Sequence, residues 1–356
     1  MSSIAALLQA AEYIDWYERG MSKEWQDLPD ELILKILSYS EVIDLISCGQ
    51  VSKRTRNVSR DCSLWLTANL QDKIVKTELL ELILIKGCKI LSISNSTIVG
   101  CLSSNINSNL KVLNLSQSMW GLPKVIGLAK PMYRLKNIDF LEQLLFSCSS
   151  LQQLEIDGFC ITSKMAASIC KNGKTLQTLN LNHSFVYEST YPHSTNYRLD
   201  NTVPNGSLQV IIKSCQELKE VNLDYINGKE GLSEVDLEFF AKNITTNIEK
   251  LNLVNHGVDD DQVKLLLSRC NKIRELSLDA YIMTDDSLKY IRQYLNLTLE
   301  ELSLVEDDDI SFTGFLELKS MPRLKLLNLY HKKDEEIQNL RQHLPHVKIL
   351  GNIDLF

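Results

Sequence analysis

The sequence lacks most of the features that mark a secreted, membrane-spanning or nucleotide-binding protein. No apolar run approaches the ~20 residues of a membrane span, and no basic patch followed by an apolar run marks a signal peptide. Its 14 glycines are scattered, so no glycine-rich loop is present to cradle phosphate. The nine cysteines are odd in number and form no Cys-x-x-Cys pair. We therefore expect free thiols in a reducing compartment, the cytoplasm, the nucleus or both, and no membrane partner.

Signatures of catalysis and metal binding are also missing. The chain has no His-Glu-x-x-His motif, and no family signature surrounds any cysteine or histidine that could form a nucleophile–base pair. The net charge of −7 argues against a nucleic-acid partner, because such a partner needs a basic face. We predict no catalytic residue, no metal and no cofactor. An enzyme in its own right is the least favoured interpretation.

Residues 25–70 have the pattern of three short helices. Pro29 suits a first helical turn, and apolar residues then recur at helical spacing as far as Leu37. A second, apolar helix follows, and a third, basic helix runs from Ser52 to about Arg60. A unit of this size has more apolar surface than it can bury, because small domains bury a low fraction of their chain. Part of this surface should meet the rest of the chain or another protein.

This unit resembles an F-box through three sub-motifs in the expected order and spacing. They are Leu-Pro-x-Glu-Leu-Ile-x-x-Ile-Leu, then Asp-Leu-Ile-x-Cys-x-x-Val-Ser-Lys, then Ser-Leu-Trp. The resemblance implies docking on the Skp-type adaptor of a cullin–RING ubiquitin ligase. The residues that it assigns to the adaptor contact are Leu28, Pro29, Leu32, Ile33, Ile36, Leu37, Val51, Leu64 and Trp65.

After residue 70 the chain is an internal repeat. The pattern Leu-x-x-Leu-x-Leu, with conservative replacements, returns eight times from Leu110 onward, and degenerate copies lie at 88–93 and 347–350. The middle anchors Leu251, Leu276, Leu302 and Leu327 are 25, 26 and 25 residues apart, within the ~20–29 residues of a leucine-rich repeat. Each unit has one short strand and one helical pattern, and such units bury their apolar faces only by stacking.

We therefore predict an α/β fold in which a three-helix F-box precedes a leucine-rich-repeat solenoid. The solenoid should have a curved parallel sheet on its concave side and helices on its convex side. The expected organisation is an N-terminal arm with a helical pattern at 1–24, the F-box at 25–70 and the solenoid at 71–356. The F-box should also seal the open N-terminal end of the solenoid, which needs a cap.

The positions of three cysteines indicate which type of leucine-rich repeat is present. Cys148, Cys215 and Cys270 each stand three residues before the first anchor of a strand. This placement resembles the cysteine-containing repeat typical of F-box/leucine-rich-repeat proteins. We predict that these thiols are small buried fillers.

Two intervals break the period. Leu113 to Leu154 and Leu179 to Val221 span 41 and 42 residues, so we expect insertions near 117–147 and 183–210. Insertions that follow a strand become surface loops at one edge of the arc, where repeat proteins often bind partners. The alternative is a tolerated insertion without function, since lengthening a loop costs little entropy. The tyrosine-rich second segment favours function.

The positions between and just after the strand leucines should face the concave side. Acidic and amide side chains dominate them, and Lys250 is the one base. Because a concave surface lined by one sign of charge focuses potential, we expect a protein substrate that presents lysine or arginine. The predicted contact residues are Glu155, Asp157, Asn180, Asn182, Glu220, Asn222, Asp224, Glu275, Asp279 and Glu301.

The favoured interpretation is a substrate-recognition subunit of an SKP–cullin–F-box ubiquitin ligase. Its partners would be the Skp-type adaptor, through it the cullin and RING subunits, and a target protein. The alternative is a leucine-rich-repeat scaffold or inhibitor protein whose F-box is only a helical cap.

Overall fold

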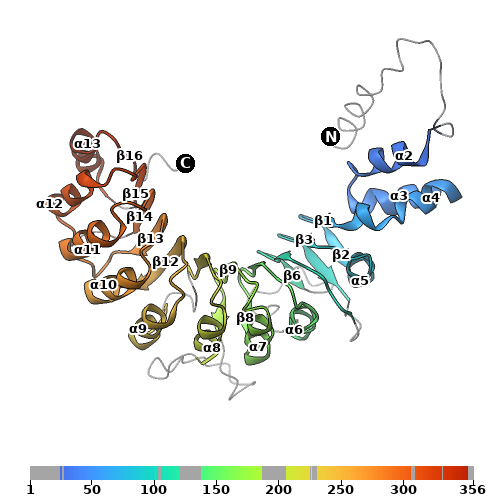
Figure 1. Ribbon diagram of the computed structural model, residues 1–356, viewed down its shortest axis with the longest axis horizontal. Helices are drawn as coiled ribbons and strands as arrows, with labels where there is room; N and C mark the ends of the chain where they lie inside the picture. The colour runs from blue at the N-terminus through green and yellow to red at the C-terminus, as the bar shows by residue number, and fades with distance from the viewer. Residues whose placement is uncertain are drawn as a thin grey trace, which may run out of the picture.

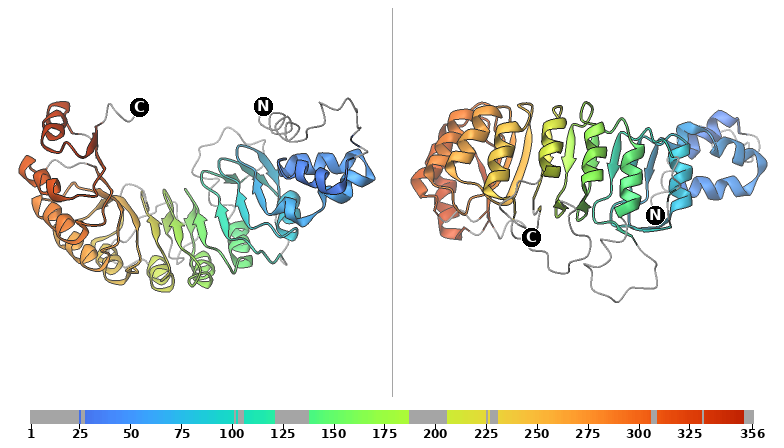
Figure 2. Two further views of the ribbon diagram at one scale, coloured as in Figure 1. Left: turned by 45° about the horizontal axis from the view of Figure 1, so that its top comes forward. Right: turned by 90° about the horizontal axis from the view of Figure 1, so that it is seen from below.

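The computed structural model describes residues 25, 28–100, 102, 106–120, 138–186, 206–224, 226, 231–305, 309–330 and 332–351. They form an open arc with strands along its inner edge, helices along its outer edge and a small helical module at the N-terminal end (Figure 1). Helices cover one face of the strands and leave the other face open along the arc (Figure 2). The predicted α/β solenoid behind an N-terminal helical module is confirmed.

The helical module contains α2 (Asp30–Leu37), α3 (Val42–Val51), α4 (Lys53–Ser59) and the short 3-10 helix η3 (Cys62–Trp65). A reciprocal cap starts α4, because the Ser52 hydroxyl accepts from the Thr55 N–H at 3.1 Å and Thr55 Oγ1 accepts from the Ser52 N–H at 3.1 Å. Trp65 is buried, and its Nε1 donates to the carbonyl of Ser59 at 2.8 Å. These contacts fix α4 and η3 to each other, where the module joins the first strand.

Eleven parallel strands make the concave sheet in sequence order. The middle anchors of neighbouring repeats pair directly, as in Leu276 with Leu302 and Leu302 with Leu327. The strands are β1 (Thr67–Asn69), β3 (Ile90–Ser92), β5 (Val112–Asn114), β7 (Gln153–Glu155), β9 (Thr178–Asn180), β11 (Glu220–Asn222), β12 (Lys250–Gly257), β13 (Glu275–Asp279), β14 (Glu301–Val305), β15 (Leu326–Tyr330) and β16 (Lys348–Leu350).

The convex helices pack their apolar sides on this sheet and form one continuous core with it. They are α5 (Thr77–Ile85), α6 (Ile138–Ser147), α7 (Ser163–Lys171), α8 (Gly206–Ser214), α9 (Glu234–Asn243), α10 (Asp260–Arg269), α11 (Asp285–Leu295), α12 (Phe312–Phe315), η7 (Leu316–Ser320) and α13 (Asp334–His343). Cys148, Cys215 and Cys270 are fully buried in the core. Burial raises the pKa of the Cys148 and Cys270 thiols to about 11, so these groups are unreactive fillers, as predicted.

The early repeats have a second short strand after a tight turn. These strands form two small sheets, β2 (Ile74–Lys76), β4 (Thr97–Val99) and β6 (Met119–Trp120) in one, and β8 (Cys160–Ile161) and β10 (Phe185–Val186) in the other. The residue three places after the concave strand has a left-handed backbone, with φ of 53° at Asn95, 78° at Gly158 and 51° at His183. The chain reverses there toward the helix, so the turn recurs with the repeat.

A buried hydroxyl links neighbouring early repeats. One residue past the left-handed turn, a serine donates to the carbonyl that follows the preceding concave strand. The pairs are Ser96 with Leu70 at 2.6 Å, Ser118 with Ile93, and Ser184 with Ile156 at 2.9 Å. Ser96 and Ser184 also accept from the N–H groups of Lys73 and Phe159, so each satisfies two backbone groups of the previous repeat.

His256 occupies the same repeat position in β12. The N–H of Leu232 donates to its Nδ1 at 3.0 Å, so the ring proton is on Nε2, which donates to the carbonyl of Leu223 at 2.8 Å. Burial lowers the pKa of His256 to about 4, although its bond to Leu223 acts in the opposite direction. The imidazole therefore takes the place of the serine hydroxyl and, like it, bonds to two backbone groups.

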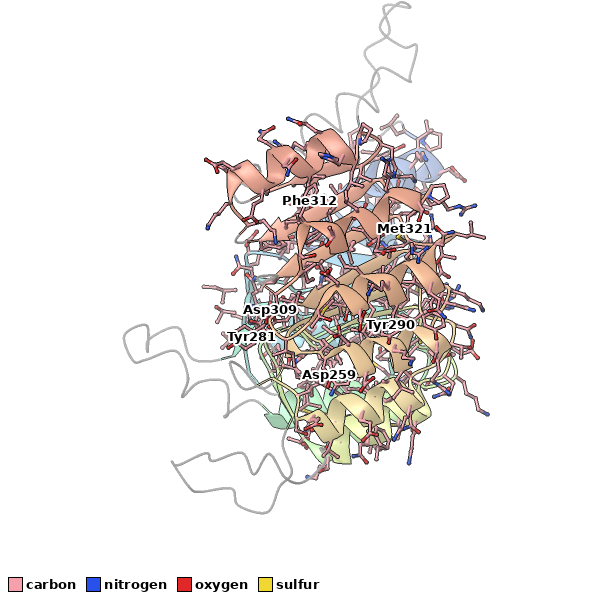
Figure 3. All side chains as sticks on the ribbon, turned by 90° about the vertical axis from the view of Figure 1, so that its left-hand side faces the viewer. Asp259, Tyr281, Tyr290, Asp309, Phe312 and Met321 are labelled. Atoms are coloured by element: carbon pink, nitrogen blue, oxygen red, sulfur yellow. The ribbon has the colours of Figure 1, made fainter. Side chains whose placement is uncertain are left out.

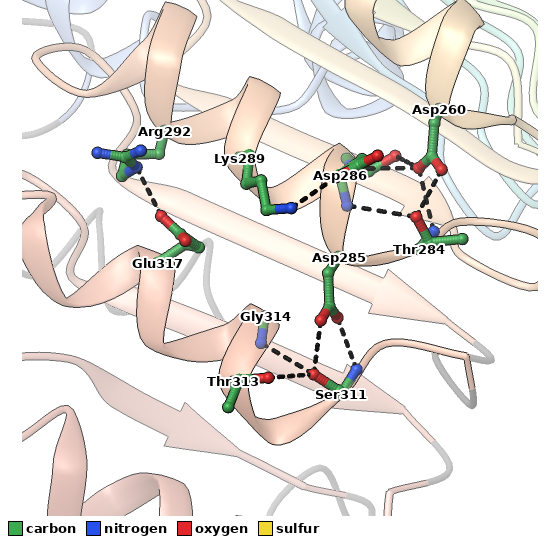
Figure 4. A network of polar contacts seen from close by, with 11 residues as sticks. Asp260, Thr284, Asp285, Asp286, Lys289, Arg292, Ser311, Thr313, Gly314 and Glu317 are labelled. Carbon is green, nitrogen blue, oxygen red and sulfur yellow. Dashed lines mark hydrogen bonds and ion pairs between the residues drawn. The ribbon is translucent and has the colours of Figure 1, made fainter.

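Later repeats are linked on the helix side by aspartates at the helix starts. Asp260 begins α10 and accepts from the backbone and hydroxyl of Thr284, the residue that caps α11, at 3.0 and 2.6 Å. One repeat further on, Asp285 of α11 accepts from the backbone and hydroxyl of Ser311, which caps α12, at 2.8 and 2.6 Å (Figure 4). Burial raises the pKa of Asp260, but hydrogen bonds from Ser287 and Thr284 outweigh it and leave the pKa lowered.

Two predicted boundaries differ from the structure. β1 belongs to the concave sheet, so the solenoid begins inside the 25–70 segment rather than at residue 71. The segments 117–147 and 183–210 include α6 and α8, which are ordinary repeat helices rather than inserted chain. Periodicity of the leucines alone did not separate a repeat helix from the insertion before it. Residues 121–137, 187–205 and 1–24 lie outside the described residues.

Candidate interaction surfaces

The nine residues predicted to contact an adaptor divide into two groups. Ile33, Leu37, Leu64 and Trp65 are buried in the chain's own core, at 9% exposure or less. Their assignment to a partner contact is corrected, since a partner cannot reach them in this conformation. The physical reason is that helical periodicity identifies an apolar side chain but not which neighbour covers it. The other five remain accessible: Leu28, Leu32 and Ile36 are half-buried, and Pro29 and Val51 are exposed.

Further exposed apolar side chains adjoin these five. Trp25 before α2, Tyr39 after it and Ile43 at the start of α3 are 43%, 51% and 36% exposed. None of them was among the predicted contacts. The signal that could have found them is the excess of apolar residues over what three short helices can bury.

The position of α2 is set by charged contacts from α4. Arg54 donates through Nε to Asp30 Oδ1 at 2.7 Å and through Nη2 to the carbonyl of Leu28. The module is joined to the first repeat by an ion pair of 2.5 Å between Lys73 and Glu41. The exposed apolar residues of α2 are therefore held in a fixed place at the end of the arc.

On the concave side, strand register brings several predicted acids together. Glu220, Lys250, Glu275 and Glu301 stand side by side on four neighbouring strands. Lys250 forms an ion pair of 2.8 Å with Glu275. The hydrogen bond that Lys250 donates to Glu275 raises the pKa of Lys250, and the charges of Glu220 and Glu301 act in the same direction against the effect of burial.

The asparagines of this face have a structural role that the sequence interpretation missed. In Asn114, Asn180, Asn222 and Asn252, Oδ1 accepts from the N–H two residues further on, at 2.9 to 3.0 Å. At Asn114, Asn180 and Asn222 this Asx turn ends the concave strand and starts the tight turn, whereas Asn252 lies inside the longer β12. The oxygens of Asn180 and Asn222 are thus already used by the chain's own backbone. Asn182 differs, because its Oδ1 is buried without a hydrogen-bond partner among the described residues.

The remaining predicted contacts keep part of their surface open. Glu155, Asp157, Asp224 and Asp279 are half-buried. Asp224 accepts from Asn255 Nδ2 at 2.8 Å, and Glu155 accepts from Asn114 Nδ2 at 2.6 Å. For Glu155 and Asp224 these partners are neutral side-chain amides.

A row of opposite charge lies at the strand starts. Lys89, Lys111, Lys219, Arg274 and Lys325 follow the first anchor of their repeats and are exposed. This row was absent from the predicted face, which counted only later strand positions.

Glu300, in the same row, balances two of these cations. It accepts from Arg274 Nε at 2.8 Å and Lys325 Nζ at 2.5 Å. The bonds from Lys325 and Arg274 lower the pKa of Glu300 to about 2. The strand-start edge is thus mixed in charge, whereas the sheet interior is acidic.

The acids are also unevenly distributed along the arc. The concave positions of β1, β3 and β5 carry no carboxylate, and they include Ile90, 43% exposed, and half-buried Val112. Every acid of the predicted face lies from β7 onward. The late repeats add Tyr281, 65% exposed, whose N–H donates to Asp279 Oδ1 at 3.2 Å. Figure 3 places Tyr281 on the same side of these repeats as Asp309.

Residues 25–71 match the family model described as F-box-like. With the solenoid already established, this decides the architecture. The chain therefore combines an F-box-like module with a leucine-rich-repeat solenoid. A solved structure of a Rad7 and Elc1 complex from yeast is similar over 98% of this chain and 87% of that one, with a TM-score of 0.52 and 14% identity. At this identity the likeness concerns the fold alone. The leucine-rich-repeat protein LegL7 of Legionella pneumophila scores 0.39 at 12% identity, over 80% of this chain and 91% of that one.

The described part of this F-box-like leucine-rich-repeat protein contains no group of three or more histidine, cysteine, aspartate or glutamate side chains placed to hold a metal ion. None of its described helices is both long and apolar enough to cross a membrane. The candidate sites are therefore two surfaces, the exposed apolar face of α2 and α3 and the open face of the sheet.

Proposed function

We propose that the protein is the substrate-recognition subunit of an SKP–cullin–F-box ubiquitin ligase. The F-box-like module docks on the Skp-type adaptor, and through it on the cullin and RING subunits. The solenoid holds a target protein for ubiquitination and proteasomal degradation in the cytoplasm or nucleus. The chain is non-catalytic: it raises the effective concentration of target lysines near ubiquitin carried by other subunits.

The observation that carries this proposal is the apolar surface that the module leaves uncovered. Leu28, Pro29, Leu32, Ile36 and Val51 belong to the F-box motifs and are accessible, although the module packs against the solenoid. A surface that only capped the repeats would be covered by them. Exposed apolar groups clustered on two adjacent helices support a protein partner.

The open face of the sheet supports a basic target. Acids predominate in its interior from β7 onward, with Lys250 among them, and the buried oxygens of Asn182 and Asn328 lack donors among the described residues. Lysine and arginine supply N–H donors as well as positive charge. A lysine or arginine bound against this face would offset the charge of the acids and would also donate to the unpartnered asparagine oxygens.

The test is co-purification of the full chain with an Skp-type adaptor and a cullin. Replacing Pro29 by serine and Ile36 by aspartate removes two accessible apolar contacts, and we expect at least a roughly 100-fold loss of adaptor affinity. The matched control is Ile85→Asp, on the outer side of α5, where the replaced side chain is 73% exposed. Thermal unfolding of both variants verifies that they fold.

Co-purification of the double variant at the wild-type level would contradict adaptor docking through this surface. The scaffold or inhibitor interpretation, with the module as a cap only, would then be favoured.

A further inference from the structure

The concave surface of the first three strands differs from the rest of the arc in both charge and polarity. Ile90 and Val112 stand side by side on β3 and β5, and Leu66, 38% exposed, precedes β1. Lys89 and Lys111 border them at the strand starts, and neither has a carboxylate partner among the described residues. We call Leu66, Lys89, Ile90, Lys111 and Val112 the entry patch. Ile90 and Val112 form its apolar centre, and Leu66 lies with Lys89 and Lys111 along its strand-start edge, because Thr67 of β1 is the residue that pairs with Ile90.

The N-terminal sequence has the complementary pattern. If residues 4–18 are helical, one stripe runs through Ile4, Leu8, Ala11, Asp15 and Glu18, at spacings of three and four residues. The stripe is apolar in its first half and acidic in its second. Glu12 adds a further carboxylate beside it.

The chain is long enough to bring the two together. Nine residues, 19–27, separate Glu18 at the end of the stripe from Leu28, and the ten Cα–Cα steps between Glu18 and Leu28 can span up to about 33 Å. Arg54 of α4 donates a hydrogen bond to the carbonyl of Leu28. The helix α4 has seven residues and is about 10 Å long, and η3 connects its end to Leu66. Leu28 is therefore within the reach of this tether from Leu66. A tether of this length gives an effective concentration near the millimolar range, so a modest contact suffices.

We infer that residues 4–18 of this chain bind the entry patch of the same molecule. The apolar half of the stripe covers Leu66, Ile90 and Val112, and its carboxylates lie beside Lys89 and Lys111. The segment then occupies the acid-free part of the sheet and leaves the acidic part from β7 onward open. A target must therefore be recognised by the later repeats, and the inference does not depend on the ligase proposal.

Zero-length carbodiimide crosslinking of the full-length protein tests this contact, since it joins only touching carboxylates and amines. We expect links from Glu12, Asp15 or Glu18 to Lys89 or Lys111, and their loss in high salt. The ion pair between Lys73 and Glu41, at 2.5 Å, serves as the internal positive control. A mixture of isotope-labelled and unlabelled protein separates links within a chain from links between chains.

Two outcomes of this experiment would overturn the inference. One is the control link forming while the N-terminal carboxylates join neither lysine. The other is that their links to these lysines occur only between labelled and unlabelled chains, which would assign the patch to a second copy.

Limited trypsin cleavage gives an independent readout at Arg19 and Lys23, which follow the stripe. Ile90→Asp places a charge at the centre of the patch and should release residues 4–18 from it. Cleavage after Arg19 and Lys23 should then be roughly 10-fold faster. Ile85→Asp, on the opposite side of the arc, is the control and should leave the rate unchanged. Equal cleavage rates in Ile90→Asp and wild-type protein, with both folded, would rule the contact out.

Discussion

The early repeats, from β1 to β9, and the late repeats, from β12 to β15, join their neighbours by different means. Early repeats use a buried serine behind a left-handed turn, which satisfies the backbone of the previous repeat on the sheet side. Late repeats have longer concave strands and use an aspartate at a helix start, which accepts from the cap of the next helix. Contacts between neighbouring repeats are therefore stabilised on the sheet side in the early repeats and on the helix side in the late repeats.

β12 stands where one arrangement gives way to the other. It is the longest strand, it contains a bulge between Leu253 and Gly257, and His256 replaces the serine. The joint at this strand also contacts the acidic part of the sheet, which begins at β7, because Asn255 Nδ2 of the same turn donates to Asp224 Oδ1 at 2.8 Å. The comparison shows that residues which join repeats can also hold side chains of the concave surface.

The largest expected effect concerns the charge difference between the two parts. Changing Glu220, Asp224, Glu275 and Asp279 to lysine reverses the acidic face of the later repeats. Capture of a basic target from lysate should be lost, by roughly 100-fold or more, because opposite charges become like charges.

The matched control for this variant changes four exposed carboxylates outside the concave face, Glu78, Glu217, Asp261 and Glu335, to lysine. Quantitative pull-down compares the two variants at equal net charge. Retained capture by the concave variant would show that the acidic face is not the binding surface.

The next effect is on His256. Replacing it by alanine leaves the N–H of Leu232 without a partner, removes one of the two donors to the carbonyl of Leu223 and opens a void, which should cost about 3 kcal/mol of unfolding free energy. Urea denaturation measures the loss. Faster hydrogen exchange at the start of α9 would locate it, and a loss below about 1 kcal/mol would show that the imidazole is dispensable.

His256 also makes stability depend on pH in a defined window. Its pKa is about 4 when folded, against 6.5 for the unfolded chain, so above pH 6.5 both states are neutral and stability is full. Between pH 6.5 and 4 the unfolded chain takes up a proton that the folded one refuses. This should remove about 3 kcal/mol of stability. The His256→Ala variant should lack this part of the pH profile in parallel melts at pH 7 and pH 4.5.

A smaller effect is expected for the serine link in the early repeats. Ser184→Ala removes a fully buried hydroxyl that serves Ile156 and Phe159, and we expect a loss of about 1–2 kcal/mol. Ser163→Ala, exposed at the start of α7, provides the comparison and should be near neutral. If the two variants melt alike, the proposed role of the serine link is wrong.

The smallest effect is on the helix side of the late repeats. Asp285→Ala removes the acceptor of Ser311 and should cost about 1 kcal/mol, because the carboxylate is only half-buried. Its neighbour Asp286 is paired with Lys289 on the surface at 2.6 Å, and Asp286→Ala should cost less than about 0.5 kcal/mol. Thermal unfolding of the two variants ranks them, and the opposite order would contradict the role given to Asp285.

Much of the fold could be predicted because each repeat places leucines at fixed positions to pack against its neighbours, so their spacing in the sequence indicates how the repeats stack. The anchors from Leu110 to Leu329 are all buried, the middle anchor of each repeat lies in a concave strand, and the weak match at 347–350 became β16. The first strand was not predicted, because Ala68 stands where the later repeats have leucine. The second strands and the left-handed turns were also missed, since Asn95 and His183 give no apolar period to detect.

The candidate surfaces were harder to predict from the sequence. Periodicity marked Ile33 and Ile36 alike, and only packing showed that the first is fully buried and the second accessible. Likewise, Asn182 and Asp224 occupy the same repeat position, yet Oδ1 of Asp224 accepts from Asn255 Nδ2 at 2.8 Å while Oδ1 of Asn182 has no partner among the described residues. Such differences depend on neighbours that lie 20 to 40 residues away in the chain.

The sequence alone determined the period, the parallel sheet and the place of the helical module, because each is a local consequence of where apolar side chains recur. Tertiary structure decided which of those side chains a partner can reach and which carboxylates share a row. It also decided that His256 replaces a serine between repeats. These features arise only when repeats are stacked in register, since each involves atoms from at least two repeats.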